Sequence, residues 1–211
     1  MKIIIPAREG SKGLPYKNRR LLDYTIDKIP EKFRNKTYVT TDDEEILERS
    51  IKKGLKGLKR RKELSEDTTS TKQVMVDVVK NLNLDQSEMV VMLYLTYPQR
   101  TWKEVESAFD FIKQNKAKSL LCRKELKVSP YLCMIEEGLQ GKQLVKHDLY
   151  RRQDYPNCFE ISHFICIFEV SELNNLNNNM YNHNTIFYKI HEVVDIDNLI
   201  DMERFYGKNY S

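Results

Sequence analysis

The chain has 211 residues, of which 40% are hydrophobic and 31% are charged. This length and balance are typical of one globular domain with a substantial core, and they exclude a disordered or fibrous chain. The 35 basic and 31 acidic side chains leave a formal net charge of only +4. Nucleic-acid binding is therefore not expected, because it calls for a clustered basic face.

Apolar runs and cysteine spacing bear on the cellular compartment. No run approaches the roughly 20 apolar residues of a membrane-spanning helix, and Pro6 and Arg8 interrupt the first apolar run. The four cysteines are Cys122, Cys133, Cys158 and Cys166. Without a Cys-x-x-Cys pair, they indicate free thiols rather than a zinc site or a disulfide framework. We expect a cytoplasmic protein with no membrane segment.

Short apolar runs alternate with helical patterns, which is typical of βαβ units around a mainly parallel sheet. Strands are predicted for residues 2–7, 37–41 and 89–95, the last being the most hydrophobic run and hence central. Acidic residues at 42–45 predict a helix start, since they are favoured at the positive end of the helix dipole. Capping-box patterns at residues 70–73 and 101–104 predict two more helices.

The last third of the chain has a different pattern. Residues 159–170 are rich in aromatic and β-branched side chains and predict a strand. Seven of the eleven residues from 174 to 184 are asparagine, which indicates a helix end followed by a surface loop. Residues 193–197 predict a strand that leads into a final helix containing Met202 and Phe205.

The loop after the first strand, residues 5–18 (IPAREGSKGLPYKN), combines small residues with cations. Its backbone N–H groups can approach phosphate oxygens, while Arg8, Lys12 and Lys17 supply positive charge. Neither the P-loop pattern nor the Gly-x-Gly-x-x-Gly fingerprint is present. From the residues alone, an anion or nucleotide site is favoured over a solvated basic loop.

Further motifs follow this loop in a characteristic order. They are residues 4–18 (IIPAREGSKGLPYKN), 40–46 (TTDDEEI), 60–71 (RRKELSEDTTST), 96–101 (TYPQRT), 151–156 (RRQDYP) and 195–197 (DID). Together they closely resemble the CMP-sugar-acid synthetases, the acylneuraminate cytidylyltransferases, over almost the whole chain. The resemblance implies a Rossmann-like, three-layer α/β/α nucleotidyltransferase fold in a single domain covering residues 1–211.

The resemblance also implies roles for individual residues. Arg8, Ser11, Lys12 and Lys17 would hold the CTP triphosphate, with Arg8 and Lys17 as the catalytic cations. Asn18, Arg60, Thr69, Ser70 and Thr71 would recognise cytosine. Arg100, Arg152 and Gln153 would bind the acidic sugar. Tyr94 is expected in the same substrate pocket because of its place at the carboxyl end of a central strand, where ligands bind in α/β proteins. The β-rich excursion at residues 129–169 would build a homodimer in which Arg152 and Gln153 reach the partner's site.

Asp195 and Asp197 match the pair that holds Mg²⁺ in the family. Two carboxylates one residue apart suit a hard cation that also binds phosphate oxygens. From the residues alone, a strand end and the N-cap of the last helix is the favoured interpretation of the same pair, and the resemblance favours the metal site instead. The four histidines, His147, His163, His183 and His191, lack ligand-like spacing and are interpreted as surface or structural residues.

The departures from the family pattern lie on the acceptor side. Residues 94–98 (YLTYP) replace the usual Gln-Pro-Thr-Ser-Pro, Leu132 replaces a basic residue, and residues 160–163 (EISH) replace Arg-x-Asn-Gly. The predicted function is Mg²⁺-dependent transfer of CMP from CTP to a sialic-acid-like nonulosonic acid, with release of pyrophosphate, for surface-glycan synthesis. The alternatives are another acidic acceptor, such as a different ulosonic acid or a phosphonate, and a catalytically silent nucleotide-binding homologue.

Overall fold

A computed structural model describes residues 1–10 and 13–209 of the chain. The helices are α1 (Lys17–Ile26), α2 (Glu31–Arg34), α3 (Glu44–Lys52), α4 (Thr71–Asn81), α5 (Trp102–Gln114) and α6 (Leu199–Asn209). The strands are β1 (Lys2–Pro6), β2 (Thr37–Thr41), β3 (Lys56–Lys59), β4 (Met89–Met92), β5 (Ser119–Glu125), β6 (Met134–Glu137), β7 (Gln140–Gln143), β8 (Phe159–Glu169) and β9 (Ile186–Lys189). Short 3₁₀ helices are η1 (Lys62–Leu64), η2 (Pro130–Leu132), η3 (Arg152–Asp154) and η4 (Val170–Asn175).

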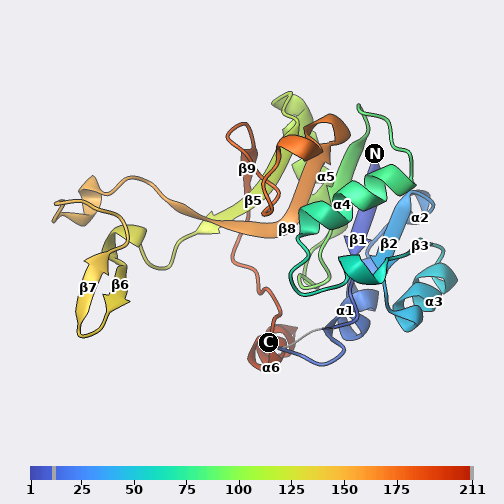
Figure 1. The fold of residues 1–211 in the computed structure, drawn as a ribbon, viewed down its shortest axis with the longest axis horizontal. Helices are drawn as coiled ribbons and strands as arrows, with labels where there is room; N and C mark the ends of the chain where they lie inside the picture. Colours follow the sequence, from blue (N-terminus) through green and yellow to red (C-terminus); the bar gives the residue numbers. More distant parts are fainter. Residues whose placement is uncertain (11–12, 210–211) are drawn as a thin grey trace.

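The central sheet of the described residues has seven strands in the order β3-β2-β1-β4-β8-β5-β9 (Figure 1). The pairs β2–β3, β1–β2, β1–β4 and β5–β9 are parallel, and β8 runs antiparallel to both of its neighbours. The sheet is thus mainly parallel, and β4 occupies its centre, as the sequence predicts.

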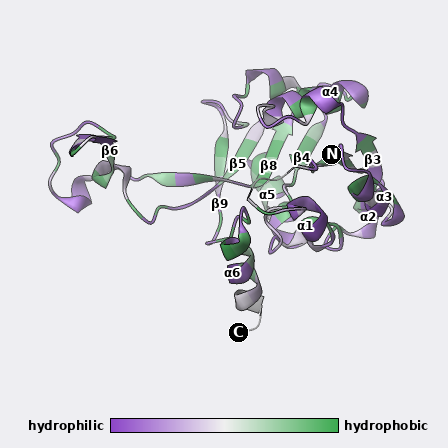
Figure 2. Cartoon of the chain, turned by 60° about the horizontal axis from the view of Figure 1, so that its bottom comes forward, coloured by the Kyte–Doolittle hydropathy of each residue, from purple (hydrophilic) through white to green (hydrophobic). Residues whose placement is uncertain are grey.

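Helices cover both faces of the sheet, which gives the predicted three layers (Figure 2). One core cluster joins alternate strand residues to α1, α5 and α6, for example Ile5 to Leu22, Ile112 and Phe205. The opposite face packs against α4 and η4 through a second cluster. Strands covered on both faces read as continuous apolar runs, which explains why β1 and β4 are recognisable from sequence.

The predicted helix starts are confirmed. Ser70 and Thr101 each cap a helix in a capping box, and the Asp43 carboxylate accepts the backbone N–H groups of Glu45 and Ile46 at the start of α3. Such caps satisfy backbone donors that have no partner within the helix. None of the described helices is long and apolar enough to cross a membrane.

Two segments differ from the sequence prediction. The predicted strand at residues 193–197 is wrong: this segment leads into α6 without regular secondary structure and makes only isolated backbone bonds, such as Ile196 N–H to Thr96 O (2.9 Å). The excursion is shorter than residues 129–169, because β8 enters the central sheet and pairs there with β4 and β5. What projects is an arm, residues 126–158, that contains the β6–β7 hairpin (Figure 1).

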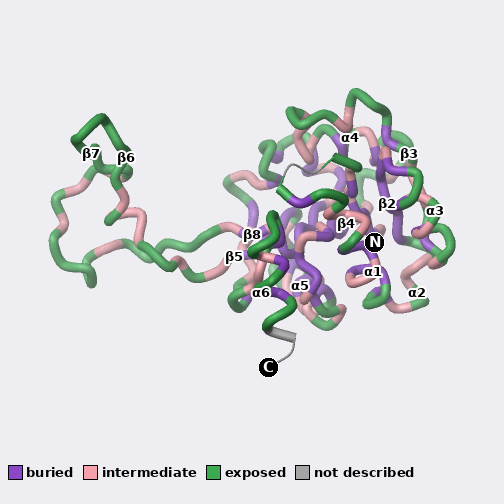
Figure 3. Tube along the Cα trace, turned by 90° about the horizontal axis from the view of Figure 1, so that it is seen from below, coloured by how far each residue is buried: buried purple, intermediate pink, exposed green. Residues whose placement is uncertain are grey.

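This arm has almost no core of its own. Every residue of β6 and β7 is exposed (Figure 3), including the apolar side chains of Met134 and Ile135. A stacked pair, Tyr131 and Tyr155, with His147 edge-on to both, is its main internal contact. A two-stranded hairpin of this kind is only marginally stable when alone in water.

Candidate functional site

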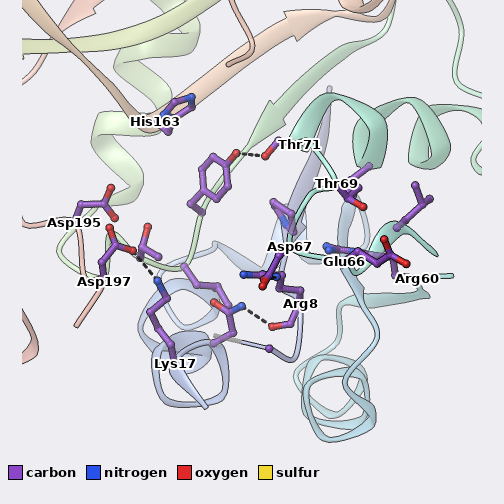
Figure 4. Close-up of a pocket in the computed structure, with 18 of the residues that line it drawn as sticks. Arg8, Lys17, Arg60, Glu66, Asp67, Thr69, Thr71, His163, Asp195 and Asp197 are labelled. Atoms are coloured by element: carbon purple, nitrogen blue, oxygen red, sulfur yellow. Dashed lines mark hydrogen bonds and ion pairs between the residues drawn. The ribbon is translucent and has the colours of Figure 1, made fainter. Parts of the chain in front are cut away.

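A cavity of about 370 Å³ opens at the carboxyl ends of the parallel strands. In open α/β sheets this edge is where ligands bind. The residues that line it are Pro6, Arg8, Gly10, Lys17, Asn18, Arg60, Leu64, Glu66, Asp67, Thr69, Thr71, Val74, Tyr94, Leu95, Thr96, Tyr97, His163, Asp195 and Asp197. Figure 4 shows Lys17, Asp195 and Asp197 at one side of the view and Arg60 and Thr69 at the other.

The loop after β1 contributes the cations. Arg8 forms an ion pair with Asp67, and Asn18 Nδ2 donates to the Arg8 carbonyl at 2.8 Å. Lys17, at the start of α1, places its Nζ 2.7 Å from Asp197 Oδ1. The Lys17 side chain is largely enclosed, whereas that of Asp197 is open to solvent. Both cations therefore stand at the cavity wall with exchangeable carboxylate partners.

Arg60 follows β3 and is buried. Its Nη2 donates to the Thr40 carbonyl at 2.8 Å, which anchors the guanidinium against the end of β2. Burial lowers the pKa of Arg60, with nearby Asp42 acting in the opposite direction. A guanidinium still carries its charge at neutral pH after such a change, so Arg60 remains a fixed donor at the cavity wall.

The start of α4 supplies hydroxyl groups beside Arg60. Thr71 Oγ1 lies 2.6 Å from the Tyr94 hydroxyl, and Thr69 Oγ1 donates to the Glu63 carbonyl at 3.1 Å. Burial raises the pKa of Tyr94 well above its ordinary value, so this hydroxyl stays protonated. Tyr94 thus turns its polar end toward the predicted nucleotide side of the cavity.

The segment that carries Asp195 and Asp197 is fixed from two sides. Gln99 Nε2 donates to the Val194 carbonyl at 3.1 Å, and the Tyr97 hydroxyl donates to Asp195 Oδ2 at 2.8 Å. On the other side the backbone of Gly13 packs directly on Asp197, since a Cβ at Gly13 would lie 2.3 Å from the Asp197 carbonyl oxygen. These contacts, rather than strand pairing, place both carboxylates at the cavity.

The two carboxylates suit a divalent cation of the Mg²⁺ type. Among the described residues no group of three or more His, Cys, Asp or Glu side chains is arranged to hold a metal. Mg²⁺ characteristically takes one or two carboxylates and completes its shell with phosphate oxygens and water. Asp195 and Asp197 fit that donor set beside a triphosphate, and they do not form a complete metal cage.

Most of the predicted nucleotide-site residues line this one cavity: Arg8, Lys17, Asn18, Arg60, Thr69 and Thr71, together with Tyr94, Asp195 and Asp197. Ser70 does not line it, because its side chain caps α4. Ser11 and Lys12 lie outside the described residues.

Arg100 does not face the cavity, contrary to the sequence prediction that it binds the sugar. Its side chain is buried and donates to the carbonyls of Phe164 (2.6 Å) and Tyr94 (2.8 Å). Burial lowers the pKa of Arg100 to about 10, which leaves it charged at neutral pH. It supports the strands behind the cavity.

Arg152 and Gln153 lie in η3 on the arm and are exposed. Arg152 borders a separate groove at the base of the arm, together with Leu132 and Tyr155. Within one chain these two residues do not meet the cavity. Their predicted role in binding the sugar requires a second subunit.

Several cavity residues were not predicted from the sequence. Asp67 and Glu66 lie within a recognised motif, but nothing in their spacing shows that Asp67 reaches Arg8. His163 was interpreted as a surface or structural residue, yet it lines the cavity, with Nε2 3.0 Å from the Asn179 carbonyl and its ring edge-on to Tyr94. A bulge in β8 explains this placement, and bulges have no clear signature in a single sequence.

The fold and the charged cavity at the carboxyl edge of the sheet define a nucleotidyltransferase of the α/β class. A family profile described as cytidylyltransferase matches residues 2–208. The chain therefore belongs to the cytidylyltransferase family, and the predicted resemblance to the CMP-sugar-acid synthetases is confirmed by its relatives.

Among those relatives, N-acylneuraminate cytidylyltransferase of Streptococcus agalactiae serotype V is 30% identical over 170 residues, 73% of this chain and 41% of that protein. Pseudaminic acid cytidylyltransferase of Campylobacter jejuni serotype O:2 is 32% identical over 132 residues, 58% of this chain and 57% of that protein. The matches thus span about half the length of these relatives.

The fold is also similar to solved structures. A CMP:2-keto-3-deoxy-manno-octonic acid synthetase complexed with CTP superposes with a TM-score of 0.72 at 14% identity, covering 99% of this chain and 98% of that one. A 4-diphosphocytidyl-2C-methyl-D-erythritol synthase from Anaerococcus prevotii gives a TM-score of 0.60 at 16% identity, covering 99% and 95%. These likenesses confirm the predicted nucleotidyltransferase fold.

Proposed function

We propose that the protein transfers CMP from CTP to an acidic sugar and releases pyrophosphate. The observation that carries this proposal is one cavity lined by the cations Arg8, Lys17 and Arg60 and by the Asp195 and Asp197 carboxylates, with Lys17 paired to Asp197. Cations would neutralise the triphosphate, and the carboxylates would bind a divalent ion. A fixed hydrogen-bond donor would recognise the cytosine base. Membership of the cytidylyltransferase family supports CTP as the nucleotide.

The reaction asks for positioning and neutralisation of charge rather than for covalent catalysis. A sugar hydroxyl forms a new bond to the α-phosphorus of CTP, the bond from that phosphorus to the bridging oxygen breaks, and pyrophosphate leaves with the electron pair. The hydroxyl proton passes to solvent or a basic group. Arg8 and Lys17 would exchange their carboxylate partners, Asp67 and Asp197, for phosphate oxygens.

Asp195 and Asp197 would hold Mg²⁺ beside the triphosphate. When bound, such an ion neutralises developing charge on the phosphates and fixes their orientation. This chain's contribution is to keep both carboxylates at the cavity through Tyr97, Gln99 and the close approach of Gly13.

Asp197→Asn tests the metal role. The change is nearly isosteric, so we expect an intact fold, unchanged CTP binding in EDTA and loss of Mg²⁺-dependent turnover. The measurements are pyrophosphate release across a Mg²⁺ titration and the thermal unfolding midpoint. A variant as active as the wild type would leave Asp197 only as a partner of Lys17.

An acidic sugar is the proposed acceptor because relatives are named for N-acylneuraminate and pseudaminic acid. Tyr94 and His163 stand on the wall where the family pattern differs from this chain, so we infer a nonulosonic acid whose contacts are not those of sialic acid. A relative from Campylobacter coli, named post-translational flagellin modification protein B, matches over 215 aligned positions at 27% identity, covering 94% of this chain and 90% of that protein. The name of this relative refers to modification of flagellin and supports a role in modifying a surface structure, which we propose to be glycan synthesis.

We further propose that the active protein is a homodimer built by the arm. Its apolar side chains, among them Leu139 and Tyr150, are exposed in a single chain. A second copy would bury them, and it would bring Arg152 of one subunit toward the other subunit's cavity. A guanidinium is suited to a sugar carboxylate because it offers two parallel donors.

Incubation of the purified protein with CTP, Mg²⁺ and a panel of acidic acceptors tests the proposal. The panel would contain N-acetylneuraminate, pseudaminate, an octulosonic acid and a phosphonate. We expect pyrophosphate release and a CMP conjugate detected by mass with a nonulosonic acid. Conjugation only to the octulosonic acid or the phosphonate would favour the alternative acceptor, and CTP binding without turnover on any acceptor would favour the silent homologue.

A further inference from the structure

The Tyr97 hydroxyl lies between the central sheet and the segment that carries Asp195. It donates to Asp195 Oδ2 at 2.8 Å. Ser162 Oγ donates to the same hydroxyl oxygen at the longer distance of 3.5 Å. Because Ser162 occupies the acceptor side of the oxygen, the single proton of the hydroxyl is directed to Asp195.

The ring of Tyr97 is held firmly. It is 4% exposed and packs edge-to-face on Phe164, with ring centroids 5.6 Å apart at 84°. Phe164 is itself buried, and its carbonyl receives Arg100 Nη1 at 2.6 Å. The hydroxyl is therefore at a fixed position relative to the sheet.

Asp195, by contrast, is exposed and belongs to a segment without regular secondary structure. The backbone of this segment is tied by Ile196 N–H to Thr96 O and by Gln99 Nε2 to Val194 O. Neither bond restrains the rotation of the Asp195 carboxylate. The bond from Tyr97 does, because it fixes the position of Oδ2.

We propose that Tyr97 is a positioning residue for the divalent cation: its hydroxyl holds the Asp195 carboxylate in one orientation before the ion and nucleotide arrive. This inference rests on the proposed function and goes beyond it by assigning a residue that acts through Asp195. Outer-sphere hydrogen bonds of this kind typically change metal affinity about 10- to 100-fold.

The test compares the wild type with Tyr97→Phe, Gln99→Ala and Tyr38→Phe. Tyr97→Phe keeps the buried ring and removes only the hydroxyl. Gln99→Ala loosens the same segment but retains the hydroxyl bond. Tyr38 is a matched control, because it is also buried and its hydroxyl meets Lys56 Nζ (3.4 Å) away from the cavity.

The readouts are Mn²⁺ affinity in the presence of CTP, measured by electron paramagnetic resonance of free Mn²⁺, CTP affinity in EDTA, and the thermal unfolding midpoint. For Tyr97→Phe we expect Mn²⁺ binding weakened about 10-fold or more, with CTP affinity in EDTA and the unfolding midpoint close to those of the wild type. Gln99→Ala should weaken Mn²⁺ binding less, and Tyr38→Phe should leave it unchanged.

Two results would overturn the role of Tyr97: wild-type Mn²⁺ affinity in Tyr97→Phe, or equal losses in Tyr97→Phe and Gln99→Ala, which would show general loosening of the segment. A wild-type protein that binds CTP but no Mn²⁺ would instead overturn the metal part of the proposed function, and the role of Tyr97 with it. The two failures are distinguished by the wild-type titration alone.

Discussion

Two cations of the cavity are paired with carboxylates. Arg8 pairs with Asp67 and Lys17 with Asp197, and in both pairs the carboxylate is substantially exposed. Solvent-exposed ion pairs contribute about 0–1 kcal/mol, so a triphosphate can displace them at little cost. In the proposed reaction, the released Asp197 would then become available to a cation when the phosphates bind.

This arrangement predicts that Arg8→Ala and Lys17→Ala each lower kcat for CMP transfer by about 10²-fold or more, because each removes a charge directed at the reacting phosphates. Arg61→Ala is the matched control, since Arg61 follows Arg60 in sequence but pairs with Asp77 and does not line the cavity. Steady-state kinetics with CTP and the best acceptor measure the effect. Near-normal rates in both variants would remove the loop from the triphosphate site.

Gly13 is the residue for which the close approach of two loops matters most. A Cβ there would lie 2.3 Å from the Asp197 carbonyl oxygen, and backbone cannot give way cheaply. We expect Gly13→Ala to displace the segment of Asp195 and Asp197 and to raise the Mg²⁺ concentration needed for half-maximal turnover. Gly207→Ala is the control, since its Cβ would meet nothing within 4 Å. An unchanged Mg²⁺ dependence in Gly13→Ala would contradict the idea that this contact positions the carboxylates.

At the scale of elements, the sequence predicts those strands and helix starts that short, local residue patterns determine. Buried strands show as apolar runs and helix starts show as caps, so β2, β4 and the starts of α3, α4 and α5 are recognisable. The segment 193–197 is misread because Val193 and Val194 favour a strand by composition, whereas its contacts come from Thr96, Tyr97 and Gln99 far away in sequence. Propensity cannot show such tertiary contacts.

The sequence also does not show where β4 and β8 separate, because this too depends on tertiary contacts. Their pairing ends at Met92 and Cys166, and β8 then bulges, since Leu121 and Cys122 pair with Cys166 and Ser162. Arg100 bridges the gap by donating to a carbonyl on each side, Tyr94 on one and Phe164 on the other. Its guanidinium thus replaces ladder hydrogen bonds, which explains why an arginine can be buried here. The sequence could place Arg100 near the site but not reveal that it faces the sheet.

Arg100→Met is therefore expected to destabilise the fold by about 2–5 kcal/mol, because two buried carbonyls lose their partner. The control is Arg34→Met: Arg34 also donates to two carbonyls, those of Ile29 and Lys53, but water can reach this partly exposed site, so we expect a loss of about 1 kcal/mol or less. Urea unfolding of both variants gives the comparison. Equal and small losses would show that water or other groups satisfy the carbonyls that Arg100 bonds.

At the scale of the whole molecule, the chain divides into a well-packed α/β body and an arm with little core. The body contains the charged cavity and the arm carries Arg152 and Gln153, so these two predicted acceptor residues stand apart from the site they would serve. In the proposed homodimer, a second copy of the chain would remove this separation, because it would cover the exposed side chains of the arm and supply Arg152 in trans.

Subunit mixing tests this arrangement. If Arg152 of one subunit clamps the sugar carboxylate in the cavity of the other, Arg152→Ala should raise the KM of the acceptor sharply and leave the KM of CTP nearly unchanged. Mixing Arg152→Ala subunits with Lys17→Ala subunits should then restore part of the activity, since one of the two sites in each heterodimer has both residues intact. Arg151→Ala mixed with Lys17→Ala is the control, because Arg151 pairs with Asp154 within its own arm. Sedimentation must show a dimer, and labelled subunits must show exchange. A fully active monomer, or no rescue despite exchange, would exclude a site shared between subunits.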